Sequence, residues 1–278
     1  MSAVARSFLP TLFEAEPPAA RARPPLKWAG GKRWQIPYLV PYWQPKQYRR
    51  LVEPFCGGLA VALGLLPENA LLNDINPHLI NFYRQLKRGF VSDLVAKNNE
   101  SFFYARRRDF NRLLKEGKSD TREAAGLFYY LNRTGFNGLC RFNRSGEFNV
   151  PFGRYEKISY KVDFREYRAL FANWEFTNLH FKELDLHEHD FIYADPPYDV
   201  EFRQYSQGGF GWHEQETTAV WLSKHPGPVI LVNQATKRII DLYRRLGFDL
   251  KFMKAPRRIS CNGDRTPAPE VMAIRNLP

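Results

Sequence analysis

The sequence has few cysteines, no long apolar run and fewer acidic than basic residues. Its three cysteines, Cys56, Cys140 and Cys261, lie far apart and are odd in number, which argues against a disulfide framework and a CxxC metal site. No apolar run approaches the roughly 20 residues that a membrane helix needs. The N-terminal residues also lack the basic stretch, apolar segment and cleavage site of a secretory signal. We therefore expect a cytoplasmic protein without a bound metal or a membrane partner.

The shortage of acids leaves a large positive charge. The chain carries 29 Asp and Glu against 41 Lys and Arg, a formal net charge of +12. Such an excess favours a polyanionic partner, although basic charge also serves solubility. At 278 residues the chain can bury a full core, and it suits one α/β domain with an inserted or appended subdomain.

The pattern of apolar and turn residues predicts the order of elements. Residues 1–23 are rich in Ala, Pro and Arg and predict a flexible leader. A strand over 51–52, a glycine-rich turn over 55–58, a helix over 59–66 and a strand over 70–72 would form a βαβ unit. Asn76-Pro77 begins a further helix that Gly89 would end. Residues 83–178, rich in Arg and aromatic residues, predict helices and a Gly/Asn-rich loop.

An α/β pattern resumes after this middle region. We expect strands over 177–184 and up to Ala194, a helix over 214–224 and a strand over 229–232. A helix over 236–246 that stops at Gly247 and two final strands near 248–254 and 270–275 complete the pattern. The simplest architecture is a mostly parallel sheet that ends in a hairpin and is interrupted by an inserted region.

The most informative motif follows the apolar run Phe191–Ala194 and consists of Asp195-Pro196-Pro197-Tyr198. This order places a carboxylate and a ring at the carboxyl end of a strand, where open α/β sheets hold ligands. A nucleobase amine is a poor nucleophile because its lone pair is delocalised into the ring. A carboxylate and a carbonyl that accept its N–H groups, with a ring stacked on the base, would localise that lone pair for attack on a methyl donor. A strand followed by a proline-rich turn would give the same four letters.

A glycine pair after the first strand indicates a cofactor site. Gly57 and Gly58 would let a ligand approach the backbone, and the next helix offers its N-terminal amides. Asp74 lies about 20 residues beyond Glu53, the separation at which an acid commonly binds ribose hydroxyls. Because this turn lacks the GxGxxG pattern, S-adenosylmethionine is favoured over a nicotinamide cofactor. A tight turn and a helix cap would explain the same residues.

Two further runs combine cations with aromatic rings. The run Lys27-Trp28-Ala29-Gly30-Gly31-Lys32 suits a clamp over a carboxylate and a stacked ring, and a basic surface loop is the alternative. The block from Leu131 to Tyr155 alternates arginines with aromatic residues and is turned by glycines. We interpret it as a basic hairpin with aromatic wedges, on which an arginine can bond guanine in the major groove. Of those rings, Phe148 and Phe152 are expected to be buried.

These blocks resemble, in this order, the Dam-type, DPPY-bearing DNA adenine-N6 methyltransferases: KWAGGK, VEPFCGG, NDIN, LNRTGFNGLCRFNRSGEFNVPFGRY and DPPY. The similarity extends from Pro25 to the C-terminus, although the glycine turn has FCGGLA where the family has FxGxG. It implies a Rossmann-like, S-adenosylmethionine-dependent catalytic domain over 24–82 and 179–278. It also implies a mainly helical DNA-recognition subdomain inserted over 83–178, and double-stranded DNA from which an adenine is flipped.

The resemblance implies roles for individual residues. The catalytic residues would be Asp195, Pro196, Pro197 and Tyr198, with the Pro196 carbonyl on the amine and the Tyr198 ring on the base. The cofactor residues would be Trp28, Lys32, Glu53, Phe55, Gly57, Asp74 and Asp195. The DNA-binding residues would be Lys27, Asn132, Arg133, Phe136, Asn137, Leu139, Arg141, Asn143, Pro151, Tyr155, Arg257 and Arg258. Among these, Lys27, Arg141 and Pro151 would touch the recognition sequence, and Phe136 and Asn137 would fill the gap left by the flipped base.

Related chemistries fit the sequence less well. Cytosine-C5 enzymes need a nucleophilic Cys after Pro, but the three cysteines here follow Phe55, Leu139 and Ser260. Cytosine-N4 enzymes tend to carry Ser, and glutamine methyltransferases Asn, where this chain has Asp195. We therefore expect an adenine-N6 methyltransferase that acts on GATC as a monomer, with or without a cognate restriction endonuclease. The alternatives are a catalytically inactive DNA-binding module and a methyltransferase with a different recognition site.

Overall fold

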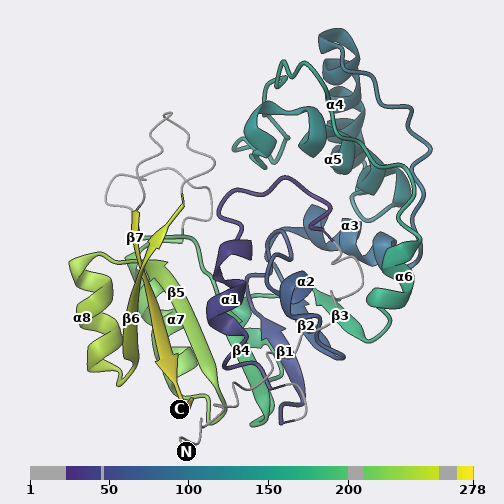
Figure 1. Ribbon diagram of the computed structural model, residues 1–278. Coiled ribbons are helices and arrows are strands. Elements are labelled where there is room, and N and C mark those ends of the chain that lie inside the picture. Colours follow the sequence, from purple (N-terminus) through teal and green to yellow (C-terminus); the bar gives the residue numbers. More distant parts are fainter. Residues whose placement is uncertain (1–22, 45–46, 200–209, 257–267, 278) are drawn as a thin grey trace, which may run out of the picture.

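A computed structural model of the chain describes residues 23–44, 47–199, 210–256 and 268–277 (Figure 1). The strands are β1 (Arg50–Glu53), β2 (Ala70–Asn73), β3 (Trp174–Thr177), β4 (Asp190–Ala194), β5 (Val229–Gln234), β6 (Asp249–Ala255) and β7 (Ala268–Arg275). The α-helices are α1 (Ile36–Leu39), α2 (Ala62–Leu65), α3 (Pro77–Lys87), α4 (Glu100–Lys115), α5 (Arg122–Thr134), α6 (Glu166–Leu170), α7 (Trp212–Ser223) and α8 (Lys237–Arg245). Three short 3-10 segments are η1 (Arg33–Gln35), η2 (Phe136–Gly138) and η3 (Phe181–Glu183). None of the helices in these ranges is long and apolar enough to cross a membrane.

The strands form one sheet in the order β3-β2-β1-β4-β5-β7-β6. The first five run parallel, whereas β7 is antiparallel to both β5 and β6. From β1 the chain proceeds outward through β2 to β3 and then returns to β4 on the other side of β1. This reversal is a topological switch point, and ligands of open α/β sheets bind beside it, at the carboxyl ends of the strands. The expected Rossmann-like α/β fold with a C-terminal antiparallel pair is confirmed.

Helices cover both faces of the sheet, so its central strands are buried on each side. On β4 the side chains of Phe191 and Tyr193 join the core cluster that includes α3 and α5. The alternate residues Ile192 and Ala194 join a second cluster, to which α7 and α8 contribute. A parallel strand covered on both faces is apolar at every position, and this accounts for the uninterrupted run before Asp195.

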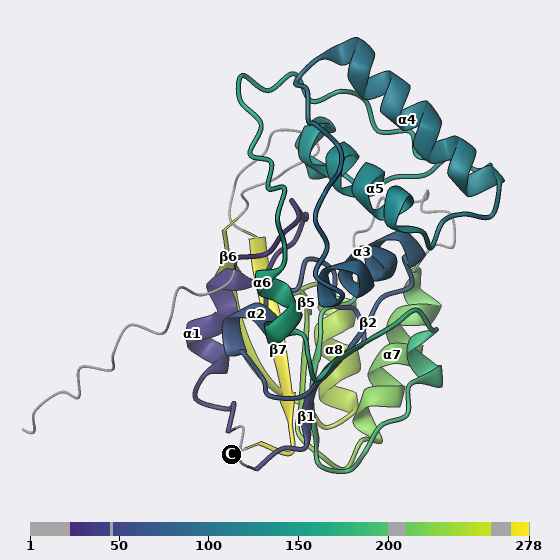
Figure 2. The same cartoon turned by 90° about the vertical axis from the view of Figure 1, so that its right-hand side faces the viewer.

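A helical layer stands beyond one edge of this assembly. Helices α4 and α5 lie away from the sheet, with α3 between them and the strands (Figure 2). The Phe82 ring on α3 stacks on the Tyr129 ring of α5, with centroids 5.3 Å apart. The segment that leads into this layer and the segment that leaves it pair through an antiparallel bridge between Val91 and Asp163. Residue 83 lies within α3, and β3 belongs to the sheet.

Two expected elements differ in the structure. The strand predicted over 177–184 ends at Thr177, because Leu179 turns to donate its N–H to the Asn73 side chain at 2.9 Å. Residues 181–183 form η3 instead, with His180 and Glu183 as its capping pair. The helix predicted over 59–66 is confined to Ala62–Leu65, because Leu59 has a left-handed φ of 59°.

Where a capping residue marks the end of a helix, the observed boundary agrees with the one predicted from the sequence. Asn76 caps α3 by accepting the backbone N–H groups of His78 and Leu79. Thr236 caps α8 through the N–H of Ile239, and Gly247 follows that helix with a φ of 77° that favours glycine. Local side-chain to backbone bonds of this kind are visible in sequence because both partners lie within a few residues.

Candidate active site

The carboxyl ends of three neighbouring strands bring the sequence motifs together (Figure 1). The glycine turn follows β1, Asp74 follows β2 and Asp195 follows β4, and these strands pair side by side in parallel. Because parallel strands end at the same edge of a sheet, the three segments converge although they are distant in sequence. Residues 27–32 join them, since Trp28 packs on the glycine turn and Lys32 reaches Asp195.

Asp195 is paired with Lys32. The ammonium Nζ lies 2.9 Å from the Asp195 Oδ2, donates to the Gly30 carbonyl at 2.8 Å and stands 4.6 Å from the centre of the Tyr198 ring. The Lys32 side chain is 5% exposed and that of Asp195 is 20% exposed. A lysine this buried requires an anionic partner, so the pair stabilises the carboxylate form of Asp195.

Only one oxygen of this carboxylate is engaged. The other, Oδ1, is buried and has no hydrogen-bond partner among the described residues. Burial raises the pKa of Asp195, and the Lys32 ammonium acts in the opposite direction. The arrangement therefore offers an anionic hydrogen-bond acceptor with one free oxygen near an aromatic ring, and an exocyclic amine, whose N–H groups donate, would need such an acceptor.

A buried chain of polar side chains lies near this pair and ends at Glu270 on β7. The Tyr193 hydroxyl donates to Gln35 Oε1 at 2.6 Å, and Gln35 Nε2 donates to Glu270 Oε2 at 3.0 Å. Burial raises the pKa of Glu270, while Lys32 opposes this rise. No motif points to Glu270, although a lone acid before the apolar residues 271–274 is an available signal.

The glycine turn is shaped to receive a ring. A Cβ atom on Gly57 would lie 2.7 Å from Trp28 Nε1, and one on Gly58 would lie 2.7 Å from Trp28 Cβ. Gly57 also has a φ of 43°, and its carbonyl accepts the Tyr83 hydroxyl at 2.6 Å. Glycine is therefore required at both positions, for space at each and for backbone conformation at Gly57.

Asp74 closes the other side of this turn. Its Oδ2 accepts the Gly57 N–H at 3.1 Å and its Oδ1 accepts the Asn76 N–H at 2.9 Å. Burial raises the pKa of Asp74, and these two N–H donors oppose the rise. Each oxygen retains a second lone pair, which is what two vicinal hydroxyls of a ribose would require. Nearby, the Phe55 ring lies 5.5 Å from Phe181, between centroids.

Glu53 lies beneath the turn. Its side chain is buried, and Oε1 accepts the Ala62 N–H at the beginning of α2 at 2.7 Å. Burial raises the pKa of Glu53 to about 8, an effect that this N–H opposes. Glu53 thus supports the turn through α2.

We expect Glu53→Gln to change how stability depends on pH. A carboxyl group whose pKa is raised on folding favours the folded state below its unfolded value of 4.5, and this contribution is lost as the pH rises through about 8. The amide does not titrate, so the variant should gain stability relative to the parent between pH 5 and pH 8. Because one pKa unit corresponds to about 1.4 kcal/mol, the gain at pH 8 should be measurable by thermal unfolding. An equal difference between the two proteins at both pH values would contradict the assignment.

The predicted basic hairpin is present as two extended segments joined by a turn. Asn143 donates its backbone N–H to Glu147, Asn149 donates to Arg141, and a bridge joins Phe142 to Phe148. Arg141 is exposed, and its Nε donates to the Asn149 side chain at 2.8 Å. Phe148 is buried, as expected, whereas Phe152 is half-buried against the core.

Helix α4 holds the hairpin in place. The Asn111 side chain accepts the Phe148 N–H at 2.8 Å and donates to the Phe148 carbonyl at 3.1 Å, as a neighbouring strand would. Arg107 donates to the Val150 carbonyl at 3.1 Å, and Lys115 pairs with Glu147 at 2.6 Å. The hairpin therefore has a fixed orientation relative to the helical layer.

Lys27 connects the N-terminal segment to α5. Its backbone N–H donates to Asn132 Oδ1 at 2.9 Å, and Asn132 Nδ2 donates back to the Lys27 carbonyl at 2.8 Å. The Lys27 Nζ donates to the Arg133 carbonyl and lies 3.5 Å from the centre of the Tyr155 ring. Burial, with a smaller effect of Arg133, lowers the pKa of Lys27 to about 8. Asn132 is 2% exposed, so its side chain acts within the protein.

The remaining candidate DNA residues lie between α5 and the hairpin. Phe136 is exposed, and Asn137 has a left-handed φ of 52° within η2. The backbone N–H of Phe136 donates to the carbonyl of Pro151, which is exposed. Leu139 is half-buried, while Asn143 accepts the N–H groups of the turn that it begins. Arg257 and Arg258 lie outside the described residues.

Across the described part of the chain, no three His, Cys, Asp or Glu residues gather in a way that could hold a metal ion. The Cys140 thiol instead lies 3.2 Å from Asn76 Nδ2, and burial raises its pKa to about 12.

Comparison with known proteins gives consistent matches over most of the chain. A family model described as D12 class N6 adenine-specific DNA methyltransferase matches residues 28–259. A DNA adenine methylase of Haemophilus influenzae is 34% identical over 283 aligned positions, covering 92% of this chain and 95% of the relative. The retron Ec67 DNA adenine methylase of Escherichia coli is 35% identical and covers 90% of each chain. The type II methyltransferase M.MjaIII of Methanocaldococcus jannaschii is 31% identical, over 87% of this chain and 94% of the relative.

Proposed function

The chain belongs to the D12 class N6 adenine-specific DNA methyltransferase family, and on this basis we propose that it methylates N6 of a flipped adenine in double-stranded DNA with S-adenosylmethionine as the methyl donor. The observation that carries the catalytic assignment is the open, buried Oδ1 of Asp195 beside the Tyr198 ring. An acceptor held anionic by Lys32, but left without a partner, matches an incoming N–H group.

In this proposal the catalytic residues act on the amine. Asp195 accepts one N–H and the Pro196 carbonyl accepts the other, while the Tyr198 ring stacks on the base. These contacts localise the amine lone pair, which forms the new N–C bond as the S–C bond of the donor breaks and its electron pair remains on sulfur. The proton that N6 loses passes to the Asp195 carboxylate and then to solvent. Pro197 continues the loop.

The residues around the glycine turn fit an adenosine-bearing donor. The two open lone pairs of Asp74 suit ribose hydroxyls, and the Phe55 ring offers a stacking surface. Gly57 and Trp28 line the approach to the backbone, and Lys32 lies at the boundary with the catalytic carboxylate. The donor supplies an electrophilic methyl group on a sulfonium centre. Glu53 supports the turn from beneath.

We assign DNA recognition to residues 91–163, a narrower region than the one expected from sequence. The exposed Arg141 on the hairpin would contact a guanine, and Phe136 and Asn137 would enter the gap left by the flipped base. Five further candidates surround Phe136 and Asn137 where the N-terminal segment meets α5 and the hairpin: Lys27, Arg133, Leu139, Pro151 and Tyr155. The side chains of Asn132 and Asn143 form hydrogen bonds that fix the backbone around them. On the hairpin sequence, we propose GATC as the site.

We expect Arg141→Ala to weaken selectivity. An arginine that bonds a guanine through two N–H groups contributes about 1–3 kcal/mol of discrimination, which corresponds to roughly 5- to 150-fold in relative kcat/KM. The measurement compares GATC duplexes with single-base variants of the site. Arg144→Ala, exposed in the turn of the same hairpin, is the matched control and should preserve selectivity. Unchanged ratios for Arg141→Ala would remove it from the recognition contacts.

Transfer of labelled methyl groups tests the function itself. The purified full chain should label GATC duplexes from tritiated S-adenosylmethionine, and DNA from a methylation-deficient host that expresses it should carry N6-methyladenine at GATC. If the modified adenines lay in another sequence, the proposed activity would stand and that sequence would replace GATC as the recognition site. DNA binding without any label would identify a catalytically inactive DNA-binding module and overturn the proposal.

A further inference from the structure

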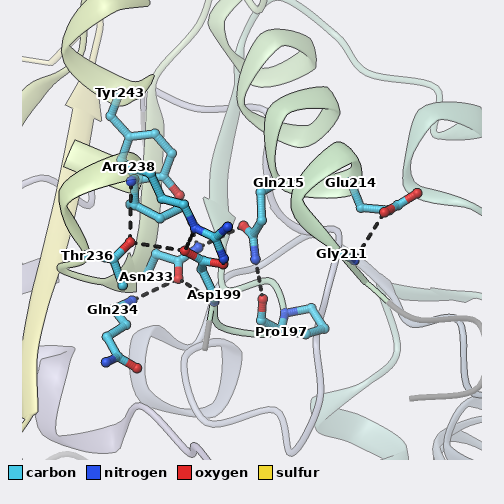
Figure 3. A network of polar contacts seen from close by, with 11 residues as sticks. Pro197, Asp199, Gly211, Glu214, Gln215, Asn233, Gln234, Thr236, Arg238 and Tyr243 are labelled. Atoms are coloured by element: carbon cyan, nitrogen blue, oxygen red, sulfur yellow. Dashed lines mark hydrogen bonds and ion pairs between the residues drawn. The ribbon is translucent and has the colours of Figure 1, made fainter. Parts of the chain in front are cut away.

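Two fully buried amides lie directly behind the DPPY loop (Figure 3). Asn233 on β5 is 0% exposed and Gln215 on α7 is 2% exposed. Buried amides are costly unless each polar atom is paired, so their partners show what they are fixed to. Neither residue belongs to a motif that the sequence identifies, and neither has a role in the function proposed above.

Backbone donors determine how the Asn233 amide is oriented. Its Oδ1 accepts the N–H of Asp199 at 3.1 Å and that of Gln234 at 2.8 Å. A backbone N–H can only donate, so this side of the amide must be its oxygen, and the nitrogen must face the other way. Nδ2 accordingly donates to Gln215 Oε1 at 2.9 Å and also points to the Tyr243 hydroxyl at 3.3 Å.

This orientation imposes one on Gln215. Because Gln215 Oε1 accepts from Asn233, its Nε2 is directed to the Pro197 carbonyl, to which it donates at 2.7 Å. The chain of hydrogen bonds has a single polarity, from the backbone N–H of Asp199 through two side chains to the Pro197 carbonyl. The peptide groups on either side of Tyr198 are thereby joined to β5 and α7.

A second set of contacts anchors the end of the loop. The Asp199 carboxylate is buried, pairs with Arg238 and accepts the Thr236 hydroxyl at 3.0 Å. Thr236 is the cap of α8, and the positive end of a helix dipole favours a carboxylate there. Arg238 in turn lies 4.7 Å from the Trp212 ring at the start of α7.

We propose that Gln215 and Asn233 are positioning residues for methyl transfer, which hold the Tyr198 ring and the Pro196 carbonyl at the flipped adenine. This inference rests on the proposed function. Tyr198 stands between the two anchored peptide groups, and Pro196 precedes the anchored Pro197, so rotation of either is limited by the same bonds. Misplacement of a reacting group by about 1 Å costs on the order of 100-fold in rate.

Gln215→Met tests this role, because methionine has a similar length and removes both hydrogen bonds. We expect kcat to fall about 10- to 100-fold, with the KM for S-adenosylmethionine unchanged. The fluorescence of 2-aminopurine at the target position should also differ from that of the parent complex, since it reports stacking on the flipped base. The matched control is Gln85→Met on α3, another buried glutamine, which donates to Asn81 at 3.2 Å and should keep the parental kcat.

Gln215→Glu adds a test with its own signature. A protonated carboxyl group can still donate to the Pro197 carbonyl, whereas a carboxylate cannot, so kcat relative to the parent should fall as the pH rises. The titratable and charged groups of the described residues in this network are Asp199, Arg238 and Tyr243. All three groups are also present in the parent, so their titration cancels in the ratio of the variant's kcat to the parent's kcat.

The two proposals fail in different ways. An inactive parent protein would overturn the proposed function. An active parent whose kcat and 2-aminopurine signal are matched by Gln215→Met would overturn the positioning role alone. If Gln215→Met does not fold, the pH ratio of Gln215→Glu decides, and a ratio that is constant with pH would overturn the inference.

Discussion

Replacing Asp195 with asparagine is expected to lower kcat for methyl transfer by about 100- to 10,000-fold, the range that a positioned acid–base group contributes. The amide keeps the size of the side chain but loses the negative charge that is paired with Lys32 and the capacity to take the N6 proton. The Tyr198 ring, the glycine turn and the basic hairpin remain. Binding of DNA and of S-adenosylmethionine should therefore persist.

Tritium transfer at saturating donor and DNA measures this loss, and fluorescence anisotropy and calorimetry measure the two binding steps. Glu175→Gln is the control, because Glu175 is an exposed acid on β3 of the same sheet. It should retain the parental rate. If Asp195→Asn methylated DNA at the parental rate, the carboxylate would have no part in the chemistry.

Replacing Lys32 with methionine should shift the pH dependence of kcat. Burial raises the pKa of Asp195 and Lys32 counteracts this effect, so its removal leaves the upward influence of burial. In the proposed mechanism the carboxylate is the active form, so the acidic limb of the profile should move to higher pH. A neighbouring opposite charge typically lowers an acid's pKa by about 1–3 units, so kcat below the new limb should fall roughly 10- to 1,000-fold.

The measurement compares kcat from pH 5.5 to 9.5 at saturating donor, because Lys32 also borders the proposed donor site. Arg33→Gln, an exposed cation in the next position, is the matched control and should leave the limb in place. Partial recovery of the Lys32→Met rate at high pH would support the charge-pairing role. A lower kcat with an unshifted limb would contradict it.

The local features of the fold could be predicted because their causes lie within a few residues. Asn76 and Thr236 identify the beginnings of α3 and α8 by side-chain bonds to the next turn. The apolar run before Asp195 identifies a strand buried on both faces. The strand predicted over 177–184 was wrong because Phe181, an apolar residue of this segment, lies in η3 and packs its ring against Phe55 and Trp221 instead of joining a strand.

The candidate site divides in the same way. DPPY, Asp74 and the glycine turn could be identified from sequence because each combines a strand end with a reactive group. Lys32 was also identified, as part of the KWAGGK run, but its pairing with Asp195 could not be predicted because the two residues lie on different elements. Glu270 and Asn233 belong to no motif and could not be identified. Asn132 illustrates the limit most clearly. It belongs to a DNA-recognition block by sequence, yet its side chain is buried against Lys27.

The sequence by itself determined the order of elements, the family and the residue types available for chemistry, because strand periodicity, helix caps and short motifs depend on neighbours along the chain. Only the tertiary structure decided which charge Asp195 faces, which of its oxygens stays open and how the Tyr198 loop is held. The physical reason is that pairing and desolvation depend on distance in space, and the sheet brings together side chains that the sequence separates.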